Sequence, residues 1–253
     1  MSVLERIKIN PLEIKKESSN IQDIDRYEFI ASYVKDKVIL DAACGSGYGT
    51  FFLYEKGKAD MIFGADIDVD SIRNLNEISK NNNKISFSVE DITSLTYQND
   101  FFDMIVSFET IEHITNVDLY LSEFKRVLKQ NGIVAISTPL NETEDRFQPA
   151  NPYHIREYNL TEITSIVQKH FHIEDIFFQC VEIERNMITK SMNNLGLYSN
   201  HRKVHYFLKN LIPKTVVRIV RNLFNSKHDI VKATVFSRHP ENASVVLIIA
   251  RKK

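Results

Sequence analysis

Short apolar runs alternate with helical stretches along most of the chain. The apolar runs are Lys37–Ala42, Met61–Ala65, Ile85–Val89, Met104–Phe108 and Ile133–Ser137. Apolar residues at helical spacing predict helices over residues 21–35, 46–56, 68–80, 116–130 and near 160–170, the fourth ending at Asn131-Gly132. Because buried strands that alternate with helices form parallel sheets, the pattern predicts an α/β fold with crossover helices.

The last part of the chain continues this pattern with one interruption. Further strands are predicted near residues 172–183 and 244–251, and residues 185–240 form a helical insertion between them. We therefore predict one domain from residues 1–184 with 241–253, and a separate basic insertion over residues 185–240.

Charge is divided unevenly between these two parts. The formal net charge of −1 hides 19 basic and 31 acidic residues in positions 1–186, against 13 basic and 2 acidic residues in positions 187–253. Residues 208–224 place apolar side chains on one helical face and basic ones on the other. Such a helix docks on an anionic membrane surface, packs as a cap, or forms a homodimer interface, and the sequence leaves these alternatives open.

Composition excludes several classes of protein. Hydrophobic residues make up 43% of the 253 residues, too many for a disordered chain, and only two cysteines are present, which excludes a disulfide framework. Few cysteines fit a reducing compartment, and the N-terminal residues lack the apolar core of a signal peptide. The expected location is the cytoplasm.

A glycine-rich loop follows the first apolar run. It reads Asp-Ala-Ala-Cys-Gly-Ser-Gly-Tyr-Gly over residues 41–49, and the predicted helix begins inside it. Glycines let the backbone turn sharply beside a ligand, and the helix N-terminus directs N–H groups into the loop. Asp66 ends the second run and Asp91 follows the third, so both carboxylates are predicted at the same edge of the sheet as the loop.

Five segments resemble class I S-adenosylmethionine-dependent methyltransferases: VILDAACGSGYG, GADID, VEDI, FFDMIVSFETIEHI and LKQNGIVAISTP, in this order. The resemblance implies a Rossmann-like, seven-stranded, mostly parallel sheet with helices on both faces and an insertion before the last strand. It also implies that the loop holds the methionyl part of the cofactor, Asp66 the ribose and Asp91 the adenine. The cofactor residues implied are Asp41, Ala43, Gly45, Gly47, Gly49, Asp66, Ile67, Asp91, Ile92 and Phe108.

A second polar group follows the fourth apolar run. Spacing of i, i+3 and i+4 predicts Glu109, Glu112 and His113 on one face of a helix. The loop over residues 139–158 returns to the same edge and carries His154. Two carboxylates and two imidazoles that converge there are predicted to bind Mn²⁺, Fe²⁺ or Mg²⁺. The E-x-x-E-H…H pattern also resembles small-RNA 3′-terminal 2′-O-methyltransferases and ubiquinone-type O-methyltransferases.

Other interpretations of these residues stay open. His113 or His154 is a candidate general base, and each is equally a packed side chain without chemistry. The substrate-contact candidates are Tyr27, Tyr153 and Arg156, although each also fits a structural role.

The segments that flank the sheet narrow the resemblance. DIDRYEFIASYVKDK and NPYHIREYNLTEI resemble bacterial methyltransferases of surface-polysaccharide biosynthesis. The resemblance implies a metal-assisted O-methyltransferase acting on a sugar hydroxyl or phosphoryl group of a capsule or O-antigen precursor. The alternatives are an RNA 2′-O-methyltransferase, disfavoured by the acidic residues 1–186, and a non-catalytic cofactor-binding subunit.

Overall fold

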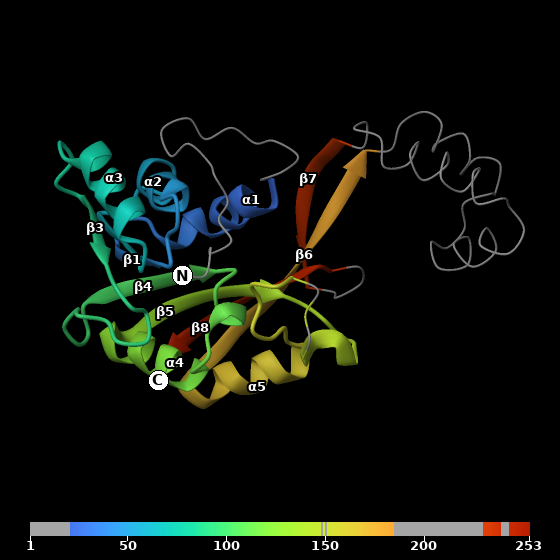
Figure 1. Ribbon diagram of the computed structural model, residues 1–253. Helices are drawn as coiled ribbons and strands as arrows, with labels where there is room; N and C mark the ends of the chain where they lie inside the picture. Colours follow the sequence, from blue (N-terminus) through green and yellow to red (C-terminus); the bar gives the residue numbers. More distant parts are fainter. Residues whose placement is uncertain (1–20, 148, 150, 185–229, 239–242) are drawn as a thin grey trace, which may run out of the picture. The chain divides into compact units, whose positions relative to one another are not determined.

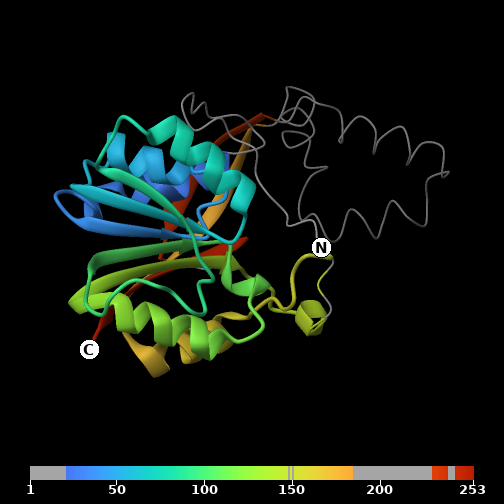
Figure 2. The ribbon, with the colours of Figure 1, turned by 60° about the vertical axis from the view of Figure 1, so that its left-hand side comes forward.

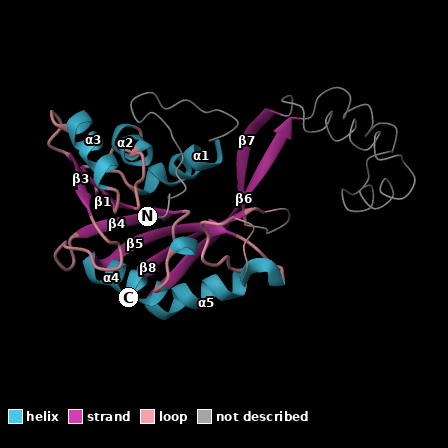
Figure 3. Cartoon of the chain, in the orientation of Figure 1, coloured by secondary structure: helices cyan, strands magenta, loops and turns pink. Residues whose placement is uncertain are grey.

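The computed structural model describes residues 21–147, 149, 151–184, 230–238 and 243–253. The helices are α1 (Ile21–Ile30), α2 (Tyr48–Glu55), α3 (Val69–Ser79), α4 (Val117–Val127) and α5 (Leu160–His170), with 3₁₀ turns η1 (Ala31–Tyr33), η2 (Ile111–His113) and η3 (Glu144–Phe147). The strands are β1 (Val38–Ala42), β2 (Met61–Asp66), β3 (Ile85–Val89), β4 (Phe102–Phe108), β5 (Leu128–Pro139), β6 (Phe171–Glu184), β7 (Ile230–Ser237) and β8 (Val245–Lys252). Figure 3 colours them by type.

The strands form one sheet in the order β3-β2-β1-β4-β5-β8-β6-β7. Strands β1 to β5 are parallel, and β8 is antiparallel to both of its neighbours. The mostly parallel Rossmann-like sheet is confirmed, with eight strands among the described residues where seven were predicted. The order reverses between β1 and β4, and in such sheets ligands lie beyond the carboxyl ends of the strands at this point.

Helices cover both faces of the sheet. Helices α1, α2 and α3 lie on one face, and α4 and α5 lie on the other (Figures 1 and 2). Neighbouring residues of one strand belong to opposite apolar clusters: Ile39 and Leu40 of β1 face different helix layers, as do Ile133 and Val134 of β5. Because both faces are buried, the strands are apolar at nearly every position, as the sequence pattern requires.

The predicted end of the fourth helix at Asn131-Gly132 is wrong. Helix α4 ends at Val127, and Leu128 is already extended and opposite Phe102 in the sheet. Asn131 adopts a left-handed φ of 62°, and the β4–β5 register shifts before Ile133. The Asn-Gly pair therefore forms an irregularity inside β5 and does not terminate a helix.

The predicted helical insertion over residues 185–240 also needs correction at its end. Residues 230–237 form strand β7, whereas residues 185–229 and 239–242, including the amphipathic stretch at 208–224, lie outside the described residues. The chain divides into two compact units, residues 1–180 with 235–253 and residues 181–234. Within the described ranges, none of the helices has the length and apolar character that a bilayer-spanning segment requires.

Candidate active site

The glycine-rich loop connects β1 to α2 at the reversal point of the sheet. Ala43, Gly45 and Gly47 all have left-handed φ values, of 62°, 55° and 76°. Gly47 precedes the first turn of α2 without a side-chain cap, so the N-terminal N–H groups of this helix face the loop without a capping side chain. A Cβ atom at Gly45 would meet no atom within 4 Å. The outer face of the loop is therefore open to a ligand.

The buried side chain of Asp41 supports this loop from the protein interior. Its carboxylate is fully buried and accepts hydrogen bonds from Thr50 Oγ1 at 2.6 Å and Tyr27 OH at 3.1 Å. Burial raises the pKa of Asp41 to about 6, and the two hydroxyl donors oppose that rise. Tyr27 is itself buried, and its ring stands where a Cβ at Gly49 would lie. Tyr27 therefore braces the glycine-rich loop, and its role as a substrate contact stays a prediction.

The raised pKa of Asp41 makes stability depend on pH. A carboxyl group whose pKa rises from 3.8 to about 6 on folding stabilises the fold below pH 3.8, and this contribution is lost as pH rises through about 6. Through this group the wild-type protein should lose about 2–3 kcal/mol of unfolding free energy between pH 4 and 7. Asp41→Asn should not show this part of the loss. Urea unfolding across this range measures it, with exposed Asp60→Asn as control. An unchanged pH slope in Asp41→Asn would contradict the prediction.

Asp66 stands at the end of β2, beside the loop. Its Oδ2 accepts the Gly45 N–H at 2.8 Å and its Oδ1 accepts the Asp68 N–H at 3.0 Å. Asp66 thus lies at the carboxyl edge of β2, where the resemblance implies a ribose contact, and that contact stays a prediction. Asp68 has a different task, because its side chain caps the N-terminus of α3. Ile67, between them, is 59% exposed and presents an apolar face at the same edge.

Three further cofactor candidates lie around this edge. Asp91 is exposed, and its Oδ1 accepts from the Thr93 N–H at 2.8 Å and from Thr93 Oγ1 at 2.6 Å, which lowers its pKa. Ile92 is buried in the core. Phe108 packs edge-on against Tyr27, with ring centroids 4.9 Å apart. The adenine contact of Asp91 stays a prediction.

The predicted helical face of Glu109, Glu112 and His113 does not exist. Glu109 follows β4 with a left-handed φ of 49°, and only Ile111–His113 form a single 3₁₀ turn. The turn separates the side chains: Glu112 is 1% exposed, whereas Glu109 accepts a hydrogen bond from Ser137 Oγ. The α-helical spacing fails because the chain must bend sharply where the strand ends.

Three of the four predicted metal ligands do come together. Potential ligand atoms of Glu112, His113 and His154 all lie within 4.8 Å of one another, and Glu109 is outside this group. Glu112 Oε2 accepts from Thr138 Oγ1 at 3.0 Å, while its buried Oε1 has no hydrogen-bond partner. Burial raises the pKa of Glu112 well above its ordinary value, and the Glu109 carboxylate adds to the rise. An orphaned carboxylate oxygen beside two imidazoles fits a cation.

Each imidazole is oriented by an oxygen atom. His113 Nδ1 lies 2.8 Å from the Tyr153 carbonyl oxygen, and His154 Nδ1 lies 2.8 Å from Glu157 Oε1. An oxygen acceptor requires Nδ1 to carry the proton, so the neutral rings present their Nε2 lone pairs. His154 Nε2 is 3.0 Å from the Asn151 amide nitrogen, which a metal ion would have to displace. Glu157 and Asn151 have no counterpart among the predicted site residues.

Backbone hydrogen bonds bring the loop of His154 to the turn. The Glu112 carbonyl oxygen accepts from the N–H of Ile155 at 2.8 Å and from that of Arg156 at 3.3 Å. Arg156 Nη2 donates a hydrogen bond to Glu162 Oε1 at 2.8 Å, and the guanidinium group lies over the Phe147 and Tyr158 rings. Tyr153 is 40% exposed beside His113. Of these two substrate-contact candidates, Tyr153 has the more accessible side chain.

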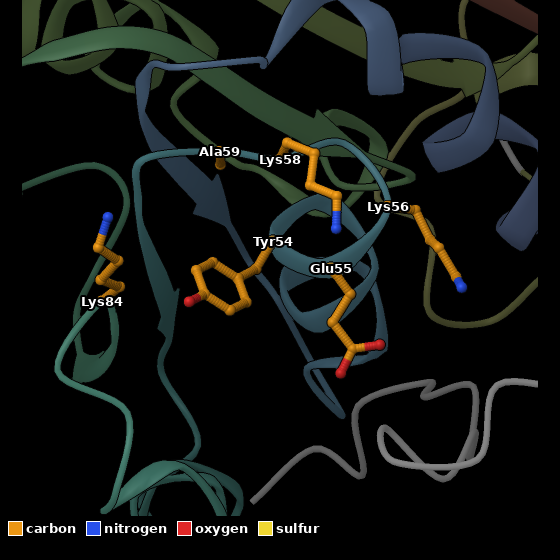
Figure 4. A pocket seen from close by; sticks show the side chains of 6 residues that line it. All are labelled: Tyr54, Glu55, Lys56, Lys58, Ala59 and Lys84. Carbon is orange, nitrogen blue, oxygen red and sulfur yellow. The ribbon is translucent and has the colours of Figure 1, made fainter.

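A separate pocket opens at the opposite edge of the sheet. It is lined by Tyr54, Glu55, Lys56, Lys58, Ala59 and Lys84, around the end of α2 and the starts of β2 and β3 (Figure 4). Lys84 is already paired with Asp60 at 2.8 Å. None of the predicted site residues lies there, and the carboxyl ends of the strands remain the candidate site.

The sequence pattern of the methyltransferase-domain family matches residues 33–197. The chain belongs to this family, within the class I S-adenosylmethionine-dependent methyltransferases. A probable S-adenosylmethionine-dependent methyltransferase of Mycolicibacterium smegmatis is 27% identical over 59% of this chain and 57% of its own length. The ubiquinone biosynthesis O-methyltransferase of Pelagibacter ubique is 29% identical over 53% of this chain and 55% of its own. The chain thus spans about half the length of the curated relatives it matches.

Solved structures share the fold. The YcgJ protein of Bacillus subtilis matches with a TM-score of 0.60 at 16% identity, over 91% of this chain and 99% of its own. A Haemonchus contortus phosphoethanolamine N-methyltransferase, solved with S-adenosylmethionine, matches with a TM-score of 0.54 at 17% identity, over 90% of this chain and 52% of its own. The open face of Gly45, the uncapped start of α2 and the carboxylate of Asp66 beside the loop fit such a cofactor.

Proposed function

We propose that this protein is an S-adenosylmethionine-dependent O-methyltransferase in which Glu112, His113 and His154 bind one divalent metal beside the cofactor. The observation that carries the metal site is the orphaned Glu112 Oε1 next to two imidazoles whose Nδ1 atoms are each held by an oxygen. A metal held by these three residues would lower the pKa of an acceptor hydroxyl and would fix its position. With imidazole ligands, Mn²⁺ or Fe²⁺ serves at least as well as Mg²⁺.

Methyl transfer is an in-line displacement at the sulfonium methyl carbon. An acceptor oxygen forms a bond to that carbon, the carbon–sulfur bond breaks, and its electron pair stays on sulfur as a neutral thioether. The glycine loop and Asp66 hold the donor, and the Glu112 cluster holds the acceptor. With a metal on the Nε2 lone pairs of His113 and His154, the hydroxyl proton would leave to solvent. In the metal-free alternative it leaves to His113 Nε2, whose lone pair the Nδ1 hydrogen bond leaves available.

The proposed acceptor is a sugar hydroxyl or phosphoryl oxygen of a bacterial surface-polysaccharide precursor. Its support is the resemblance of the segments around α1 and around His154 to methyltransferases of that pathway. Relatives named for ubiquinone biosynthesis and for phosphoethanolamine methylation support a small-molecule acceptor in the wider sense. The same proposal places the enzyme in the cytoplasm and without a nucleic-acid partner. Peripheral contact with the inner membrane surface and a homodimer interface are alternative roles for residues 208–224.

Binding and turnover of the full chain test this proposal in sequence. Calorimetry with S-adenosylhomocysteine is expected to give a dissociation constant in the micromolar range. Nucleotide sugars and sugar phosphates, each supplied with Mn²⁺, are then screened for acceptor-dependent formation of S-adenosylhomocysteine. Absence of cofactor binding at millimolar concentration would exclude the enzyme class. Turnover only with an acceptor other than a glycan would exclude the polysaccharide assignment and leave the methyltransferase assignment intact.

A further inference from the structure

A buried ion cluster lies between α1, the end of β4 and strand β6. We call Asp23, Arg26, Glu109 and Gln179 the Arg26 cluster. The side chain of Arg26 is 2% exposed, and its Nη2 donates to Asp23 while its Nη1 donates to Gln179 Oε1 at 2.8 Å. The same Nη1 atom lies 4.0 Å from Glu109 Oε1. A buried guanidinium stays charged, so this cluster holds a fixed positive centre.

Glu109 is held in a backbone conformation that glutamate rarely adopts. Its φ of 49° is left-handed, and its N–H donates to the carbonyl oxygen of Ser137 at 3.1 Å and to Ser137 Oγ at 3.2 Å. Ser137 Oγ in turn donates to Glu109 Oε1 at 2.8 Å. Such strain persists where surrounding contacts over-determine it, and it gathers at functional sites.

The cluster contains more negative than positive charge. Two carboxylates, those of Asp23 and Glu109, face the single guanidinium of Arg26, and Gln179 is neutral. Ser137 and Arg26 both approach Oε1 of Glu109, and the side chain remains 27% exposed. Glu109 therefore keeps an accessible carboxylate oxygen whose charge Arg26 only partly compensates.

The position of Glu109 lies between the donor loop and the acceptor cluster. Its neighbour Phe108 packs on Tyr27, which also packs on Tyr48 at the start of α2, with centroids 5.3 Å apart. Three residues further along the chain, Glu112 belongs to the cluster with His113 and His154. The transferred methyl group must pass between these two groups, and Glu109 belongs to the turn that follows Phe108 and leads to Glu112.

We propose that Glu109, positioned by Ser137 and Arg26, recognises the positive charge of the donor sulfonium and sets a preference for S-adenosylmethionine over S-adenosylhomocysteine. Methyl transfer converts the sulfonium into a neutral thioether, so a nearby carboxylate stabilises the bound substrate and not the bound product. Glu109 is then a specificity-determining residue that limits product inhibition. The inference rests on the proposed cofactor and does not depend on the metal.

The experiment compares the affinities of the two cofactor forms. Glu109→Gln keeps the shape and the hydrogen-bond acceptor but removes the charge. We expect it to weaken S-adenosylmethionine binding by about 10-fold and S-adenosylhomocysteine binding by less than about 3-fold, measured by calorimetry. Ser137→Ala removes the hydroxyl that positions Glu109 Oε1 and should shift the ratio in the same direction by a smaller factor. Exposed Glu77→Gln on α3 is the matched control.

Every other outcome of these affinity measurements contradicts a specific part of the inference about Glu109. Equal losses for both ligands would give Glu109 a structural role or a role at the amino group, and unchanged affinities would remove it from the site. If Glu109→Gln does not fold, the affinity ratio of Ser137→Ala decides, and an unchanged ratio there refutes the inference. A wild-type protein that binds neither ligand would instead refute the proposed cofactor.

Discussion

Replacing Asp66 with alanine is expected to weaken S-adenosylhomocysteine binding by about 30- to 1000-fold. The carboxylate accepts the Gly45 N–H, and the proposed ribose would donate its two hydroxyls to it, so removal of the carboxylate leaves these donors unpaired. The expected cost is about 2–4 kcal/mol of binding free energy. Isothermal titration calorimetry measures it, with exposed Asp60→Ala as the control.

A fragment of the cofactor separates the two tasks of Asp66. Methylthioadenosine contains the ribose and the adenine but lacks the amino-acid part. If Asp66 binds the ribose, Asp66→Ala weakens both ligands by similar factors. A loss confined to S-adenosylhomocysteine would instead place the effect in the Gly45 loop and the methionyl part, and would refute the ribose assignment.

Removal of divalent metal is expected to lower turnover by about 100-fold or more and to leave S-adenosylhomocysteine affinity unchanged within about twofold. The reason for the difference is spatial: Glu112, His113 and His154 form the proposed metal site, whereas the loop and Asp66 form the cofactor site. Turnover is measured after treatment with EDTA and again after addition of Mn²⁺, Fe²⁺ or Mg²⁺.

Variants of the two histidines and their partners refine this test. His113→Ala and His154→Ala should each reproduce the effect of EDTA. Glu157→Gln, which removes the carboxylate behind His154, should weaken metal binding by about 10- to 100-fold. His172→Ala on β6 is an exposed control. Full activity in excess EDTA together with inactive His113→Ala would exclude the metal and leave His113 as a general base.

Local sequence patterns were sufficient for most elements of the fold, but not for strand β7. The runs at 61–65 and 85–89 became β2 and β3 with bounds equal or nearly equal to those predicted, because a short apolar or alternating run is typical of a strand. The loop at 41–49 was readable for a similar reason, since closely spaced glycines permit left-handed backbone at Gly45 and Gly47. The failure at Asn131-Gly132 shows the limit, because this pair serves an irregular strand as well as a helix end.

The candidate site could be predicted only in part from the sequence. His154 was correctly expected near Glu112 and His113, because parallel strands end at one edge of the sheet. The separation of Glu109 from this group was missed, since a helical spacing rule does not hold in a three-residue 3₁₀ turn after a strained residue. Arg26 was missed as well, because its i, i+3 pairing with Asp23 resembles an ordinary exposed helix pair.

The fold class, the glycine loop and the types of residue available at the carboxyl edge could all be predicted from the amino-acid sequence. These follow from periodicity, glycine conformation and strand direction, which are properties of short segments. The tertiary structure decided which side chains meet: Arg26 with Gln179, and the Glu112 carbonyl oxygen with Ile155. The partners in the first pair are 153 positions apart. A contact of this kind depends on the placement of whole strands and loops, so no local pattern encodes it.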